Sequence, residues 1–165
     1  MIFKFLSKNF YISFSIVPLI YFLDRLSKIY VIQLDKDNLG SDIFNSTYLN
    51  IVLIWNKGIA FGLLSFNEDY LYNILSIIIS MIVVVLFIMS IKSQGFKRYS
   101  LLMVIGGALG NLHDRIFFKA VPDFIDFHIG GFHWFIFNVS DIFITFGIIF
   151  LIVLEVSSNK EEKYE

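Results

Sequence analysis

Four apolar segments, each of roughly 20 residues, limit what this chain can fold into, because a helix of that length crosses the hydrocarbon core of a bilayer. They cover about residues 10–31, 71–91, 99–118 and 134–156. Hydrophobic residues are 57% of the 165 positions and charged residues only 16%, a balance too apolar for an ordinary soluble domain. We therefore predict one membrane domain covering residues 1–165, an all-α bundle of four transmembrane helices.

Lysine and arginine residues predict the orientation of the spans, since they gather on the cytoplasmic side of membrane proteins. They lie before the first span (Lys4, Lys8), between the second and third (Lys92, Lys97, Arg98) and after the fourth (Lys160, Lys163). Two predicted spans separate each of these sites from the next, so all three lie on the same side of the membrane. Both termini are therefore predicted to be cytoplasmic. The first apolar run is too long for a signal peptide and lacks a small-residue cleavage site, so we expect an uncleaved helix.

The two remaining connections, residues 33–70 and 119–132, then lie outside the cell membrane. In the first, residues 47–55 have the composition of a strand, and residues 56–58 are typical of a turn. We expect a small β platform on the outer membrane surface.

Composition argues against several other kinds of site. The chain has no cysteine, which excludes disulfides, thiolate catalysis and cysteine-based metal sites. Its net charge of −1 gives no indication of a nucleic-acid partner. The spacing of His113, His128 and His133 fits no zinc signature, and His133 beside Trp134 is typical of a membrane interface, so no metal is expected.

Ionisable residues from separate segments are predicted to meet at one depth in the outer leaflet. Asp24 lies about seven residues below the outer end of its span, which is roughly 10 Å at ~1.5 Å per residue. Asp114 and Arg115 are near the outer end of the third span, Asp141 is near the start of the fourth, and Asp123 is in the loop between them. A charge at the edge of hydrocarbon costs several kcal/mol unless it is paired, so this convergence indicates a functional site.

Asp123 and Asp141 allow two interpretations from chemistry alone. Aspartyl acid–base hydrolysis needs at least two carboxyl groups that lie close together. They can equally be caps at helix ends, since Asp141 lies close to a predicted helix N-terminus.

The other polar and small residues have simpler interpretations. Asp24 and Lys28 are four apart on one helix face, which favours an ion pair that orients neighbouring groups. Asp114 and Arg115 fit an ion pair at the membrane interface, although an arginine near two carboxylates would also keep one of them ionised. The glycine-rich run 106–110 is interpreted as a close-packing surface between helices.

Five motifs follow one another along the chain. They are DRLSK (24–28), NKGIAFG (56–62), GGALGNLHDR (106–115), VPDFI (121–125) and FNVSD (137–141). In order and spacing they resemble the lipoprotein signal peptidase family, also called signal peptidase II. Pro122 and Ser140 depart from the residues usual in the family, and neither change removes a carboxylate.

The resemblance implies an intramembrane aspartyl endopeptidase with four helices, a small extracytoplasmic sheet and a short, mobile extracytoplasmic helix. Such an enzyme removes the signal peptide of bacterial prolipoproteins, cutting just before a cysteine that carries a diacylglyceryl group. By position, the catalytic pair is Asp123 and Asp141. Polar positions around the site are Asn56, Gly58, Asn111, Arg115 and Asn138, and the supporting positions are Asp24 and Lys28.

The resemblance further implies a multi-pass protein of the bacterial inner membrane, with its site near the outer leaflet and no metal or organic cofactor. Its partners would be lipid-modified prolipoproteins and membrane lipids, and we expect a monomer. Two rival functions use the same buried charges: a small transporter or proton-relay protein, and a non-catalytic assembly subunit.

Overall fold

The computed structural model describes residues 8–40, 43–58 and 69–161. Its elements in chain order are α1 (Lys8–Phe14), α2 (Ile16–Asp37), β1 (Phe44–Asn45), β2 (Leu49–Asn56), α3 (Asp69–Lys92), α4 (Gly95–Phe118), β3 (Val121–Ile129), β4 (Phe132–Phe137) and α5 (Val139–Glu161). Four helical stretches are long and apolar enough to cross a membrane, namely Phe10–Asp37, Tyr72–Lys92, Gly95–Phe118 and Val139–Ser157. The prediction of four spans is confirmed.

Helix α4 is the centre of the bundle and packs against α2, α3 and α5. In its most apolar stretch 61% of the residues are buried, against only 6% in α3. Helix α3 has the higher mean hydropathy, 3.1 against 1.2, because most of its surface faces outward, where lipid would surround it. Helix α4 can carry polar residues because neighbouring helices cover them.

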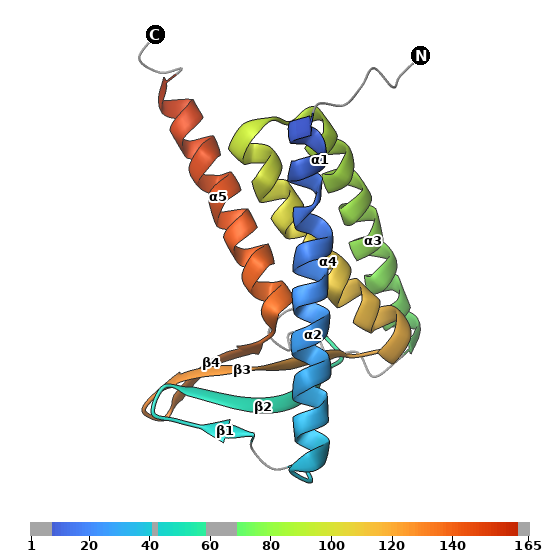
Figure 1. The fold of residues 1–165 in the computed structure, drawn as a ribbon, viewed down its shortest axis with the longest axis vertical. Helices are drawn as coiled ribbons and strands as arrows, with labels where there is room; N and C mark the ends of the chain where they lie inside the picture. The colour runs from blue at the N-terminus through green and yellow to red at the C-terminus, as the bar shows by residue number, and fades with distance from the viewer. Residues whose placement is uncertain (1–7, 41–42, 59–68, 162–165) are drawn as a thin grey trace.

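A four-stranded antiparallel sheet in the order β1-β2-β3-β4 lies at one end of the bundle (Figure 1). The start of α1, the α3–α4 connection and the end of α5 lie at the opposite end (Figure 1). This arrangement agrees with the prediction that the three basic sites share one side. Strand β2 confirms the strand predicted at 47–55.

The chain between α4 and α5 differs from the prediction, which was wrong there in two respects. The fourth span was predicted to begin at residue 134, but α5 begins at Val139, and Asp123 was placed in a loop but lies in β3. Residues 132–137 instead form β4, which pairs with β3. Aromatic and apolar residues occupy both faces of β4, so the alternation that marks a strand is missing and the segment resembles the start of a span.

Two further boundaries differ from the prediction. The first span continues past residue 31 to Asp37, where α2 extends beside the sheet (Figure 1). The third helix begins at Gly95, four residues before its predicted start at 99. Residues 8–40, 43–58 and 69–161 do not include the short extracytoplasmic helix implied by the resemblance; the one short helix among them, α1, lies at the end of the bundle opposite the sheet (Figure 1).

Candidate active site

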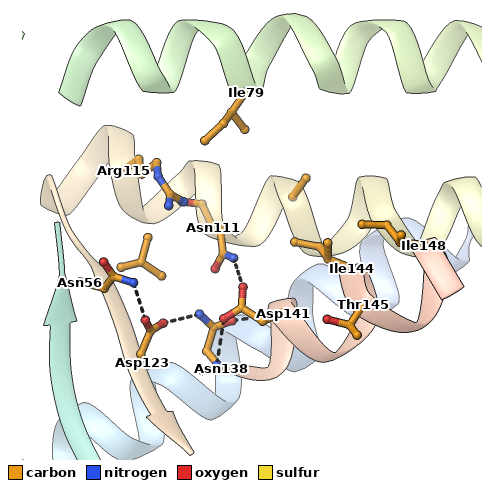
Figure 2. Close-up of a pocket in the computed structure, with 12 residues that line it drawn as sticks. Asn56, Ile79, Asn111, Arg115, Asp123, Asn138, Asp141, Ile144, Thr145 and Ile148 are labelled. Atoms are coloured by element: carbon orange, nitrogen blue, oxygen red, sulfur yellow. Dashed lines mark hydrogen bonds between the residues drawn. The ribbon is translucent and has the colours of Figure 1, made fainter. Parts of the chain in front are cut away.

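A cavity of about 310 Å³ opens between the sheet and helices α3, α4 and α5, and both Asp123 and Asp141 line it. Its other lining residues are Asn56, Ile79, Ala108, Asn111, Arg115, Val121, Asn138, Ile144, Thr145 and Ile148. Figure 2 shows the asparagine, aspartate and arginine side chains gathered toward the sheet, with Ile144, Thr145 and Ile148 further along α5. The cavity therefore combines a polar end with an apolar wall that faces along the bundle.

Asp123 is the third residue of β3, and two asparagine amides hold its carboxyl group. Asn56 at the end of β2 donates from Nδ2 to Oδ2 over 2.8 Å. Asn138, between β4 and α5, donates from Nδ2 to Oδ1 over 2.6 Å. The antiparallel pairing of β2 with β3, with Asn56 opposite Val121, brings the first of these donors into reach.

Asp141 and Asn138 form a reciprocal cap at the start of α5. The backbone N–H of Asn138 donates to Asp141 Oδ2 over 3.1 Å, and the N–H of Asp141 donates to Asn138 Oδ1 over 3.2 Å. This is the arrangement of a capping box, which satisfies N–H groups that have no partner within the helix. Asp141 is thus a helix cap that also faces the cavity, and the two interpretations from sequence are compatible.

The pKa of Asp123 is raised to about 6, first by burial and then by the negative charge of Asp141. The side chain is 4% exposed, which disfavours the ionised form. The amides of Asn56 and Asn138 favour the ionised form and limit the rise of the pKa. A carboxyl group that titrates near neutral pH can act as a general acid or base.

Arg115 connects α4 to the turn that follows β2. Its guanidinium donates to the carbonyl oxygen of Gly58 over 3.1 Å and to that of Asn111 over 3.3 Å. Asn56 Oδ1 accepts a bond from the N–H of Gly58 over 2.8 Å, so the same turn fixes the side chain that donates to Asp123. The rest of the NKGIAFG motif, residues 59–62, lies outside the described residues.

Four charged residues form a buried cluster between α2 and α4. Lys28 lies 2.9 Å from Asp24 and 2.7 Å from Asp114, and Arg25 pairs with both oxygens of Asp114 at 2.6 and 2.8 Å. The expected pair of Asp24 and Lys28 is confirmed. Asp114 was predicted to pair with Arg115 at the interface, which is wrong, because Asp114 is fully buried and points toward α2.

Arg25 was not among the predicted site residues. It lies next to Asp24 within the DRLSK motif, and its charge balances the second carboxylate of the cluster. Charge balance could have indicated this residue. Asp24 and Asp114 are two carboxylates inside the predicted spans, Lys28 alone cannot neutralise both, and buried charges need partners.

Hydrogen bonds connect the buried cluster to Asp141. Lys28 Nζ donates to Asn111 Oδ1 over 2.9 Å, and Asn111 Nδ2 donates to Asp141 Oδ1 over 2.8 Å. Asp24 Oδ1 also accepts the backbone N–H of Ser140 over 3.0 Å. The cluster therefore fixes both the side chain of Asp141 and the backbone that precedes it.

Glycines in the 106–110 run allow α4 to approach its neighbours closely. A Cβ atom on Gly107 would lie 2.5 Å from the carbonyl oxygen of Ser140, and one on Gly110 would lie 2.6 Å from Asp24 Oδ2. Neither contact is possible without displacing α5 or the buried cluster. The close-packing interpretation of this run is confirmed.

Of the three histidines, none lines the cavity with Asp123 and Asp141. His113 on α4 bonds to the hydroxyl of Tyr21 over 2.8 Å. His128 and His133 lie opposite each other on β3 and β4, close to Asp126, a grouping that was not predicted from the sequence.

The chain matches the family model described as Signal peptidase (SPase) II over residues 16–157. The lipoprotein signal peptidase of Pelagibacter ubique (strain HTCC1062) is 44% identical over 158 residues, which are 96% of this chain and 95% of that protein. This chain belongs to the signal peptidase II family. It is therefore an aspartic peptidase and a multi-pass bacterial membrane protein.

Other relatives agree in sequence and in fold. The lipoprotein signal peptidase of Anaplasma phagocytophilum (strain HZ) is 42% identical over 142 residues, covering 84% of this chain and 88% of that protein. A bacterial membrane enzyme solved by the in meso method at 2.3 Å resolution superposes with a TM-score of 0.73 at 29% identity, covering 93% of this chain and 92% of the other. A second such enzyme, solved at 1.9 Å, gives a TM-score of 0.70 at 31% identity, covering 86% and 90%. The bundle with its sheet is thus the fold of these enzymes.

Proposed function

We propose that Asp123 and Asp141 are the catalytic pair of this peptidase and that it cleaves signal peptides from prolipoproteins. The observation that carries the proposal is their shared cavity, in which amides of Asn56, Asn111 and Asn138 hold both carboxyl groups in place. Family membership supplies the reaction class, and the name of the relatives supplies the substrate.

The reaction needs one proton shared by the two carboxyl groups, because two like charges at close range do not both ionise readily. The ionised carboxylate accepts a proton from a water molecule, whose oxygen attacks the scissile carbonyl carbon. The protonated carboxyl group gives its proton to the carbonyl oxygen, which forms a tetrahedral intermediate. As the C–N bond breaks, the first carboxyl group gives its proton to the leaving nitrogen, and the second carboxylate takes a proton back from one hydroxyl of the intermediate, which becomes the carboxylic acid product.

We also propose that the substrate carries a diacylglyceryl group on the cysteine after the cut. The apolar wall of the cavity, which includes Ile79, Ile144 and Ile148, is open to such a group. Acyl chains would hold the cysteine at the outer leaflet, which is the depth expected for the sheet end of the bundle. The enzyme would then lie in the inner membrane as a single-domain monomer surrounded by lipid, with both termini cytoplasmic.

The positions of the buried polar residues argue against the transporter alternative. In the described part of the chain, all buried charged residues lie toward the sheet end, and the buried polar residues of the other half are serines, Ser13, Ser90 and Ser100. A proton pathway would need titratable groups through the whole membrane thickness. An assembly subunit without catalysis would not need a carboxyl pair in a cavity.

Replacement of either aspartate by asparagine tests the proposal. Asp123→Asn and Asp141→Asn should each lower the rate of cleavage of a diacylglyceryl-modified prolipoprotein by a factor on the order of 10²–10⁴, the usual contribution of a general acid or base. Asp37→Asn, at an exposed position near the end of α2, is the matched control and should keep the wild-type rate. Near wild-type cleavage by either cavity variant would disprove the assignment.

A further inference from the structure

A second group of side chains able to bind a metal lies on the β3–β4 hairpin. Asp126, His128 and His133 each offer one ligand atom, and these atoms all lie within 4.8 Å of one another. We propose that this group binds a divalent transition-metal ion, with zinc as the best match. The site would contradict the expectation from sequence that the chain holds no metal.

The pairing of the two strands brings the three side chains together. His128 and His133 are directly opposite each other, and their rings stack with centroids 4.9 Å apart and planes 21° apart. His133 Nδ1 lies 2.8 Å from Asp126 Oδ2 and 3.1 Å from Oδ1. Asn50, opposite Asp126 on β2, donates to Oδ2 over 3.3 Å and helps to orient the carboxylate.

This site is separate from the cavity of Asp123 and Asp141. Successive side chains of a strand point to opposite faces, so Asp126 and His128 point away from the face that carries Asp123. None of Asp126, His128 and His133 lines that cavity. An ion bound here would therefore fix the far end of the strand that carries Asp123, without contacting the reacting atoms.

Two features of the cluster favour a cation here. Asp126 is 4% exposed, and a carboxylate that is nearly removed from water is most stable beside a positive charge. The Nδ1 atom of His128 is buried and has no hydrogen-bond partner among the described residues. A buried polar atom without a partner costs about 1–3 kcal/mol, and coordination of a cation through this Nδ1 atom would remove that cost.

The donor atoms select the kind of ion. Two imidazole nitrogens and one carboxylate oxygen are a usual set for zinc with a water molecule in the fourth position, whereas calcium and magnesium prefer oxygen ligands alone. Two ligands of tetrahedral zinc lie about 3.3 Å apart, so small side-chain rotations would bring the three atoms into position. The side chain of His133 is 54% exposed, which leaves a route by which an ion can enter.

Zinc titration of the full-length protein tests the site. Protein without a polyhistidine tag is purified in detergent, stripped with a chelator and titrated with zinc chloride by calorimetry. We expect binding of one ion per chain and a higher melting temperature with zinc, because a ligand that binds only the folded state stabilises it. His128→Gln and His133→Gln should each weaken binding by at least about tenfold.

The control is His113→Gln, which makes the same exchange at the histidine on α4 and should keep the wild-type affinity. Melting curves without zinc show whether each variant is folded. Because His133 is exposed, its replacement should disturb the fold less than replacement of His128. Absence of one-to-one binding by the wild-type protein would overturn the proposal. So would unchanged affinity in both hairpin variants, or loss of binding in Asp123→Asn, which would place the ion in the cavity instead.

Discussion

At the scale of single residues, Asn138 connects the two candidate catalytic groups. Its side-chain amide donates to Asp123, its side-chain oxygen accepts from the backbone of Asp141, and its own N–H donates to Asp141. The residue is fully buried, so these bonds do not compete with water. The pair of aspartates is therefore positioned by the cap of α5 as much as by the sheet.

The raised pKa of Asp123 leads to a prediction about pH. Its value of about 6 means that the carboxyl group loses its proton as the pH rises through this range, so kcat/KM should fall on the alkaline side. The amide of Asn56 favours the ionised form. Asn56→Ala should therefore raise this pKa and move the alkaline limb to higher pH by roughly one unit.

The measurement is a pH profile of cleavage for both proteins, with Asn73→Ala as control. Asn73 bonds to Lys119 at an exposed position and should leave the profile unchanged. An alkaline limb that stays in place or moves to lower pH in Asn56→Ala would contradict the role given to this amide.

At the scale of elements, α4 carries the packing surface, two polar residues of the cavity (Asn111 and Arg115) and one residue of the buried cluster (Asp114). The glycine run was predictable from the sequence, because small residues in a span indicate close helix contact. The buried charged cluster between α2 and α4 was only partly predictable. The pair of Asp24 and Lys28 follows from helix spacing, whereas the contact of Asp114 with Arg25 depends on how α2 faces α4.

Gly110→Ala should disrupt this contact. Its new methyl group would meet Asp24 and Ser140, so either α5 shifts or the buried cluster opens. Overpacking of a well-packed contact costs about 1–3 kcal/mol, and we expect a lower melting temperature together with slower cleavage. Gly131→Ala is the control, because nothing lies within 4 Å of the added atom at that position. Equal melting temperatures for the two variants would contradict the packing account.

Strands β3 and β4 were not predictable from local sequence. Strand β2 has a recognisable composition and a turn after it, but β4 has aromatic residues on both faces and merges with the span that follows. The strand structure of β4 depends on its pairing with β3, and the local sequence of β4 does not indicate that pairing. The position of Asp123 in a strand was missed for the same reason, although the motif around it was recognised.

At the scale of the whole molecule, apolar length predicted the four spans correctly, and the elements that carry the three basic sites lie at one end of the bundle (Figure 1). Which side of the membrane that end faces stays a prediction. The absence of cysteine makes the orientation itself testable, since a single introduced thiol is labelled without background. Gly131→Cys in the β3–β4 turn should react with a membrane-impermeant maleimide in intact spheroplasts. Gln94→Cys, in the exposed α3–α4 connection, should react only after the membrane is opened. The reverse pattern would contradict the proposed topology.

The central claim is that Asp123 and Asp141 act as one acid–base unit, and the rate of a double variant tests it most directly. Residues that act as a unit have non-additive effects, because removal of one already disables the other. Single-turnover cleavage of a lipidated prolipoprotein should therefore fall to the same residual rate in Asp123→Asn, Asp141→Asn and the double variant. Losses that multiply in the double variant, or a single variant that keeps near wild-type cleavage, would contradict the claim.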